Sequence, residues 1–389
     1  MDRVIDRKPV SIYIHIPFCR RKCRYCDFLS WPNQLENLQD YVNALIKEID
    51  RYRGWLADRL VSTVFFGGGT PSLMNPEQVC RIIHEINQKG HLSGTAEITM
   101  EANPDQLTEE KLEGYRDAGV NRLSIGLQST DPALLSFLGR NHTAHDFYKA
   151  VEAARKAGIQ NINGDLIFGI PGQTLEQWRS SLEEVVKVQL PHLSCYGLTY
   201  EEETPLYRSL IRNEFQPIDE DLEWNMFRHG IQWLQESGYE HYEISNYALP
   251  GYQCLHNLTY WENREYIGLG VGAHGFLEGE RVENTSSLSD YFQMLERNRF
   301  PVINRHKISV TESVSETCFL GLRLRKGISE QRFLERYGKP LLEFYPSIIP
   351  QLIERELLVK DKGYLRLTEV GIDLSNQVFE ALMLEEKLK

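Results

Sequence analysis

Short runs of β-branched and aromatic residues alternate with longer helical segments along the first half of the chain. Six such runs occur, at residues 11–16, 62–66, 97–101, 122–128, 162–168 and 193–199. Helical stretches such as residues 40–53 and 175–188 separate them. Strands that alternate with helices form parallel sheets with right-handed crossovers. The pattern therefore predicts an α/β fold, an open six-stranded partial barrel of the (β/α)6 type.

Polar and glycine-rich segments follow several of these predicted strands. A loop with three cysteines follows the first strand, the run GGGTP at residues 67–71 follows the second, and EANP at residues 101–104 ends the third. Chemistry in such folds takes place at the carboxyl ends of the strands. We therefore expect the functional site at this edge of the sheet.

The cysteine loop has the spacing CxxxCxxC, with Cys19, Cys23 and Cys26. Structural zinc usually takes four protein ligands, and a [4Fe–4S] cluster held only by cysteine also takes four. Three close cysteines therefore predict a cluster with one iron open to a substrate or cofactor. The alternatives are a zinc site completed by a distant residue, or three buried cysteines without a metal.

Composition agrees with a protein that keeps its thiols reduced. The chain has 7 cysteines in 389 residues, an odd and low number that argues against a disulfide-rich secreted fold. The N-terminal run MDRVIDRKPV has no apolar segment, and no apolar run approaches the roughly 20 residues of a membrane span. We expect a cytoplasmic protein.

The net charge of the chain is −12, from 43 basic and 55 acidic residues. No long basic tract is available to contact a phosphate backbone. We therefore expect no nucleic-acid partner.

The pattern changes beyond residue 300, which divides the chain into two predicted domains, residues 1–300 and 301–389. Residues 311–389 hold 12 basic and 13 acidic side chains and suggest helices followed by a hairpin at residues 357–368. This order is typical of a mainly helical, winged-helix-like domain. Its balanced charge argues against DNA binding and favours a module for packing or partner docking.

An aromatic residue, Tyr25, directly precedes the third cysteine. The motif therefore resembles the cluster motif of radical S-adenosylmethionine (SAM) enzymes. The resemblance implies a partial barrel and a [4Fe–4S] cluster bound by Cys19, Cys23 and Cys26. It also implies that the open iron binds the amino and carboxylate groups of SAM, and that an electron from the cluster can release a 5′-deoxyadenosyl radical.

The glycine run at residues 67–71 lacks the lysine of a P-loop. Glycines let a backbone approach a ligand closely, although a tight turn between strand and helix is the simpler alternative. In the radical SAM family this segment binds the amino group of SAM. A second run at residues 270–275 satisfies GxGxxG, but it follows the predicted barrel instead of opening a Rossmann unit, so we expect no dinucleotide there.

The resemblance extends to the oxygen-independent coproporphyrinogen oxidase branch of this family. It implies that SAM is contacted by Tyr13, Tyr25, Gly68, Gly69, Thr70, Glu101, Gln128, Arg140 and Asp165. The chemistry is suitable, because carboxylates accept hydrogen bonds from ribose hydroxyls and Arg140 can pair with the methionine carboxylate.

Two features distinguish the branches of that family. Coproporphyrinogen oxidases carry a fourth cysteine two residues after the third, where this chain has Phe28. That difference puts decarboxylase activity in doubt. His256, Asn257, Tyr260 and Trp261 form an HNxxYW motif, which resembles the heme chaperone branch.

The HNxxYW motif suits a heme surface, because a histidine can ligate heme iron and aromatic rings pack against a porphyrin. We therefore predict heme contacts by these four residues. An ordinary structural cluster is the alternative. His241, His274 and Cys254 are rival iron ligands.

The resemblance implies a heme chaperone that binds the cluster, SAM and heme and delivers heme to apo-proteins of respiration. It further implies a heme donor protein and a reductant such as flavodoxin or ferredoxin. A homodimer and membrane association through partners remain open. So do three enzymatic alternatives, which are coproporphyrinogen III decarboxylation, heme ring opening and radical methyl transfer. No catalytic residue is assigned.

Overall fold

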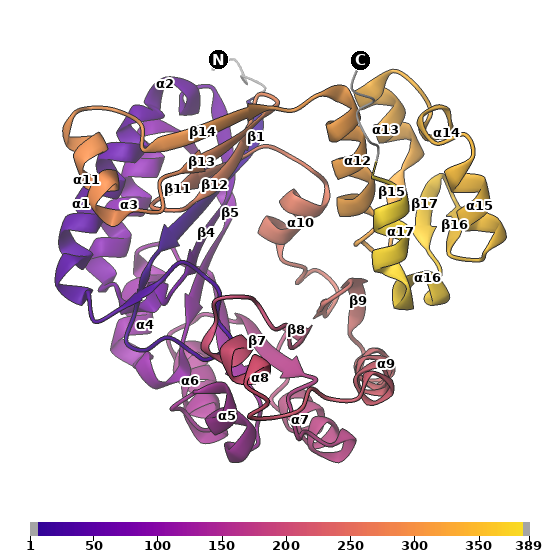
Figure 1. Cartoon of the computed structure of the whole chain (residues 1–389). Helices are drawn as coiled ribbons and strands as arrows, with labels where there is room; N and C mark the ends of the chain where they lie inside the picture. The colour runs from indigo at the N-terminus through magenta and orange to yellow at the C-terminus, as the bar shows by residue number, and fades with distance from the viewer. Residues whose placement is uncertain (1–6, 384–389) are drawn as a thin grey trace.

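One open sheet of twelve strands organises the computed structural model, which describes residues 7–383 (Figure 1). Its centre contains six parallel strands, and these confirm the predicted partial barrel. They are β1 (Lys8–Ile16), β4 (Arg59–Gly68), β5 (His91–Ala102), β6 (Arg122–Gln128), β7 (Asn161–Phe168) and β8 (His192–Gly197). Ile12 and Ile14 of β1 are fully buried, as expected for a parallel strand covered on both faces.

Helices cover the outer face of these strands, and the predicted helices at residues 40–53 and 175–188 are confirmed. Asn75 and Thr174 begin two of them with capping boxes, in which the cap side chain and the third helical residue satisfy each other's backbone donors. The helices of this part are α1 (Leu38–Arg51), α2 (Arg53–Leu56), α3 (Pro76–Lys89), α4 (Glu109–Asp117), α5 (Pro132–Leu138), α6 (Ala144–Lys156), α7 (Leu175–Lys187), α8 (Pro205–Ile211) and α9 (Glu220–Glu236). Within residues 7–383, no helix combines the length and apolarity that a membrane crossing requires.

The sheet continues beyond the six predicted strands on both sides. β11 (Tyr266–Leu269) pairs parallel to β1 and is followed by β12 (His274–Leu277), β13 (Glu280–Asn284) and β14 (Val302–Lys307). On the other side, β10 (Asn246–Ala248) and β9 (Glu240–Glu243) follow β8. β14 and β9 lie at opposite ends of the strand order, so the barrel stays open. β14 also lies beyond residue 300, where the sequence predicts the domain boundary.

The second glycine run joins the antiparallel strands β11 and β12, so it does not open a Rossmann unit. A Cβ on Gly268 would lie 2.0 Å from the carbonyl oxygen of His274. The N–H of Gly270, a residue with a φ of +99°, donates to the buried carboxylate of Glu48. These glycines therefore allow close packing of the backbone.

Helix α10 (Leu255–Trp261) lies between the barrel and the C-terminal domain (Figure 1), and α11 (Leu288–Glu296) packs near α1. The C-terminal domain has its own apolar core, which includes Val314, Phe333 and Leu352. The predicted helices and hairpin are confirmed. The elements are α12 (Val310–Gly321), β15 (Ile328–Ser329), α13 (Glu330–Tyr337), α14 (Leu341–Phe344), α15 (Ile348–Glu354), β16 (Leu358–Asp361), β17 (Tyr364–Leu367), α16 (Glu369–Asp373) and α17 (Ser375–Ala381).

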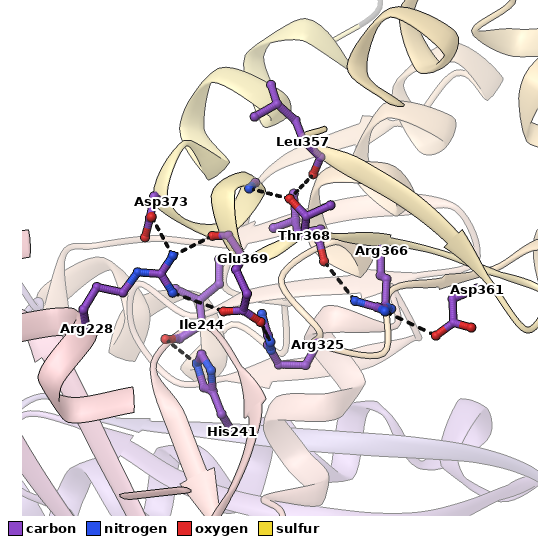
Figure 2. Close-up of polar contacts among 12 residues, drawn as sticks. Arg228, His241, Ile244, Arg325, Leu357, Asp361, Arg366, Thr368, Glu369 and Asp373 are labelled. Atoms are coloured by element: carbon purple, nitrogen blue, oxygen red, sulfur yellow. Dashed lines mark hydrogen bonds and ion pairs between the residues drawn. The ribbon is translucent and has the colours of Figure 1, made fainter. Parts of the chain in front are cut away.

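An ion-pair network connects the C-terminal domain to the barrel (Figure 2). Arg228 of α9 donates from Nη2 to Asp373 at 2.6 Å and from Nη1 to the Glu369 carboxylate at 3.1 Å. Arg325 also pairs with Glu369. Asp373 is only 17% exposed, so its charge depends on this arginine for compensation.

We expect Arg228→Ala to lower the free energy of unfolding by about 1–3 kcal/mol, because hydrogen bonds to charged groups contribute about that much and Asp373 is left without its cation. Urea unfolding measures the change. Arg212→Ala is the matched control, since Arg212 makes only a 3.8 Å surface pair with Glu214. Equal effects of the two substitutions would contradict a stabilising role for the network.

Candidate cluster and cofactor site

A cavity of about 510 Å³ opens at the carboxyl ends of the barrel strands. The three cysteines and eight of the nine predicted SAM residues line it. These residues are Cys19, Cys23, Cys26, Tyr25, Gly68, Gly69, Thr70, Glu101, Gln128, Arg140 and Asp165. The edge of the sheet that the sequence predicted is therefore the edge at which they meet.

The cysteine thiols lie in a polar and partly cationic loop environment. Cys19 ends β2 (Phe18–Cys19), and its Sγ accepts from the Thr70 hydroxyl at 3.5 Å. Arg140 donates from Nη1 to the Sγ of Cys23, also at 3.5 Å. Burial raises the pKa of the Cys26 thiol to about 12. Iron must therefore displace a proton when it binds there, as metals do at thiol ligands.

The donor set fits a cluster better than a single ion. Among residues 7–383, no three His, Cys, Asp or Glu side chains are spaced to hold one metal ion. A [4Fe–4S] cluster has a different requirement, because each cysteine binds a separate iron. All seven cysteines are free of disulfides, and the three of the motif face one cavity, so these residues fit the cluster.

The glycine segment connects the cysteine loop to the third strand of the barrel. Gly68 has a φ of +110°, a conformation that favours glycine, and its N–H donates to Oε2 of Glu101 at 3.2 Å. The N–H of Gly69 donates to the carbonyl oxygen of Ile16 at 2.8 Å. Backbone groups of this segment therefore line the cavity wall beside Cys19.

Two carboxyl groups lie deep in the cavity. Burial, and then the nearby charge of Asp165, raise the pKa of Glu101 to about 8. Burial also raises the pKa of Asp165, which accepts from Ser124 at 3.0 Å and Asn163 at 2.7 Å. Such groups can accept hydrogen bonds from the hydroxyls of a bound sugar.

Backbone strain occurs at the same cavity. Gln128 ends β6 with a φ of +69°, next to an irregularity in the β6–β7 register. Non-glycine residues in this region are uncommon and concentrate at functional sites. Arg140 stabilises the turn by donating to the carbonyl oxygen of Gly126 at 2.7 Å and to Asn103 at 2.9 Å.

Tyr13 is the one predicted SAM residue that the large cavity does not include. It lines an adjoining cavity of about 210 Å³, and its hydroxyl lies 3.0 Å from Nδ1 of His15. The two cavities share Gly68, Glu101 and Asp165 as wall residues. Tyr13 therefore shares the smaller cavity with three of the other predicted contacts and is separated from the cysteine loop by that common wall.

The HNxxYW motif lies on α10, and most of it faces this smaller cavity. His256, Asn257 and Tyr260 line it. Nδ1 of His256 lies 2.7 Å from the Thr63 hydroxyl, and Nε2 lies 2.8 Å from the Tyr260 hydroxyl. Burial is the main cause that lowers the pKa of His256 to about 3. The imidazole is thus neutral, and both of its nitrogens are engaged.

Trp261 points to a different part of the molecule. The guanidinium of Arg323 lies 4.4 Å from the centre of its ring, and the side chain lines a pocket with residues of the C-terminal domain. The structure therefore brings three residues of the motif together and separates the fourth from them. Motif spacing could not show this split, because Trp261 ends α10 and is placed by contacts with residues of the C-terminal domain.

The rival iron ligands differ in accessibility. His241 is buried, and its Nε2 lies 3.1 Å from the carbonyl oxygen of Ile244 (Figure 2). Cys254 is buried, and its Sγ lies 3.6 Å from the carboxylate of Glu97. His274 is exposed. Of these three side chains, only that of His274 lies on the surface.

Sequence reasoning missed a polar layer in the barrel interior. Asn163 donates to Ser124 at 2.7 Å and its Oδ1 lies 2.7 Å from Nδ1 of His192. Arg122 is 2% exposed beside this layer. A signal was available in the alternation of side chains along a strand, in which every second residue faces the same side. In β7, Asn163 and Asp165 are two positions apart, and in β6, Ser124 lies two positions after Arg122.

Comparison with known proteins agrees with this geometry. The family model of the radical SAM superfamily matches residues 13–185, and that of the HemN C-terminal domain matches residues 308–374. A solved structure of coproporphyrinogen III oxidase (HemN) from Escherichia coli superimposes with a TM-score of 0.85 at 20% identity, and covers 98% of this chain and 91% of its own. That likeness confirms the fold.

The fold and the site define a radical SAM protein, and membership of this superfamily implies a [4Fe–4S] cluster and SAM. Curated relatives are more specific. The heme chaperone HemW of Bacillus subtilis is 37% identical over 96% of this chain and 99% of its own, and that of Escherichia coli is 37% identical over 98% and 100%. The chain belongs to this HemW family. A mitochondrial radical SAM domain-containing protein 1 of Danio rerio is 31% identical over 96% of this chain and 87% of its own.

Proposed function

We propose that the protein is a heme chaperone that binds a [4Fe–4S] cluster, SAM and heme, and delivers heme to apo-proteins of respiration. Cys19, Cys23 and Cys26 hold the cluster. SAM binds at the open iron of the cluster and is contacted by the nine residues predicted for it. Helix α10 contacts heme through the HNxxYW residues, with His256, Asn257 and Tyr260 on the side of the smaller cavity and Trp261 on the side of the C-terminal domain.

One observation supports this proposal above the others, namely the shared wall of the two cavities. Gly68, Glu101 and Asp165 border both the cavity of the cysteine loop and the cavity of α10. A ligand on α10 is therefore exposed to any change that SAM or the cluster produces in these residues. When bound, the cluster and SAM would supply redox chemistry to this interior.

Two further facts favour a carrier over a decarboxylase. The curated relatives that cover nearly the whole chain carry the name heme chaperone. Phe28 stands where the oxidases have a fourth cysteine, and its phenyl ring has no N, O or S atom, so it cannot replace a metal ligand. A heme donor protein and a flavodoxin or ferredoxin as reductant are part of the proposal.

Anaerobic reconstitution separates a carrier from an enzyme. The protein is loaded with iron and sulfide, then given heme, dithionite and SAM, while the Soret band, 5′-deoxyadenosine and porphyrin products are measured. We expect intact heme that transfers to an apo-cytochrome, with little coupled product. Stoichiometric 5′-deoxyadenosine with an altered porphyrin would instead establish an enzyme.

The hydrogen bond between Tyr260 and His256 makes the role of His256 testable in two directions. If Nε2 ligates iron, it must first give up the Tyr260 hydroxyl. Tyr260→Phe removes that competitor and should raise heme affinity about fivefold, because one hydrogen bond is worth about 1 kcal/mol. His256→Ala should lose the ligand and shift the Soret band. Wild-type heme spectra and affinities in both variants would show that His256 only anchors α10.

A further inference from the structure

A second pocket lies at the junction between α10 and the C-terminal domain. It has a volume of about 400 Å³, within the roughly 300–1,000 Å³ of small-molecule sites. Its walls come from the end of α10, from α12 and α13, and from strands β15 and β17. The lining residues are Trp261, Glu262, Arg264, Thr317, Gly321, Leu324, Lys326, Gly327, Ile328, Ser329, Arg332, Phe333, Arg336 and Tyr364.

The pocket concentrates positive charge in a protein that is acidic overall. Four of the described lining residues are basic, namely Arg264, Lys326, Arg332 and Arg336, whereas Glu262 is the acidic one. The lining therefore carries a formal charge of +3, while the whole chain carries −12. Such a local excess attracts an anion.

The contacts within the pocket leave this excess uncompensated. Glu262 is shared between Arg264 at 2.9 Å and Arg332 at 3.3 Å. Arg336 donates to the carbonyl oxygen of Asn263 at 2.9 Å, which does not neutralise its charge. The side chain of Arg332 is 72% exposed and can therefore turn toward a ligand without a large rearrangement.

Aromatic rings complete the pocket. Trp261 lines it on the barrel side, and among residues 7–383 the buried indole N–H of Trp261 has no hydrogen-bond acceptor. Tyr364 lines the pocket on the side of the C-terminal domain, and Nζ of Lys326 lies 4.7 Å from the centre of its ring. A ligand that satisfies this lining has a flat apolar face and carboxylates at one edge.

None of the described lining residues is histidine, cysteine or methionine. The pocket therefore lacks the soft and imidazole ligands of heme iron, and Tyr364 is the lining residue of a type that ligates heme iron in other proteins. Recognition in the proposed mode depends on the carboxylates and the ring face. These requirements differ from those of the cavity beside His256, where a neutral imidazole is the candidate ligand.

We propose that this junction pocket binds a tetrapyrrole by its propionates and one ring face, at a site separate from the barrel cavity. The ligand class rests on the proposed function. Arginine and carboxylate form strong charge-assisted hydrogen bonds, and Trp261 supplies the stacking surface. Because it borders both domains, the pocket lies where a heme can contact α10 from outside the barrel.

Metal-free protoporphyrin IX is the probe, because it has the propionates and the ring face but no iron. The full-length protein is titrated with it, and tryptophan quenching reports binding. Arg332→Glu should weaken binding about tenfold or more, since a charge reversal replaces attraction with repulsion. Arg355→Glu is the matched control, because Arg355 is an exposed arginine of the same domain outside the pocket. Thermal unfolding confirms that each variant is folded.

The outcomes separate this pocket from the proposed function. Protoporphyrin binding that Arg332→Glu weakens, and that His256→Ala and Arg355→Glu leave intact, supports the junction site. No protoporphyrin binding, equal binding by Arg332→Glu, or binding of an adenine nucleotide in its place overturns it. A wild-type protein that binds no heme would refute the chaperone proposal, whereas the protoporphyrin titration would still decide the junction pocket.

Discussion

Cys23→Ala is expected to reduce the iron content of the reconstituted protein from about four atoms per chain to near zero, and to abolish its brown colour. Cys23 lies between the other two ligands in the loop, and Arg140 donates to its sulfur. Without this thiolate, only two of the three cluster irons that need a cysteine ligand still have one. Cys19→Ala and Cys26→Ala should have the same effect. Iron analysis and visible absorption after anaerobic reconstitution measure it.

Cys80→Ala provides the matched control, because Cys80 is an exposed, free cysteine on α3 away from the cavity. It should retain its full iron content. Equal iron loss in Cys80→Ala would point to non-specific loading. A brown, iron-loaded protein after replacement of all three motif cysteines would show that the cluster ligands are elsewhere.

The central fold could be predicted because its local and global signals agree. The barrel strands are largely buried on both faces and are rich in β-branched and aromatic residues, as in β1, and several outer helices begin at a side-chain cap such as Thr174. The sequence of the flanking strands β9 to β14 contains no comparable pattern of alternating strands and capped helices. They are three to six residues long and pair mostly antiparallel, so their place depends on tertiary pairing with β1 and β8.

The candidate site could be predicted to a similar extent. Residues that bind through a local motif, such as those of the cysteine loop and the glycine segment, converge on one cavity as expected. The HNxxYW motif did not stay together. His256 and Tyr260 are four residues apart and share a face of α10, as helix spacing predicts. Asn257 and Trp261 are also four apart, but Asn257 lines the cavity of His256 whereas Trp261, the last residue of the helix, lines the pocket at the C-terminal domain. Contacts across domains are not encoded in the spacing of a motif.

Gly69→Ala should lower SAM affinity about 10–100-fold, although the substitution adds only one methyl group. A Cβ at this position would lie 2.7 Å from the carbonyl oxygen of Phe18 and 3.0 Å from the Sγ of Cys19. Neither a backbone carbonyl nor a cluster ligand can move freely, so the glycine segment and the cysteine loop must separate. Strain of this kind costs about 1–3 kcal/mol, and each 1.4 kcal/mol is about tenfold in affinity. Equilibrium dialysis with labelled SAM measures the loss.

Gly94→Ala is the control for Gly69→Ala, because a Cβ at Gly94 would meet nothing within 4 Å. It should bind SAM like the wild type. Iron content then identifies the cause of a loss in Gly69→Ala. If iron is retained while SAM affinity falls, the methyl group has closed the backbone surface that SAM requires. If iron falls as well, the methyl group has displaced Cys19, and the cluster loop itself depends on this glycine. Unchanged SAM affinity would show that SAM binds away from the glycine segment.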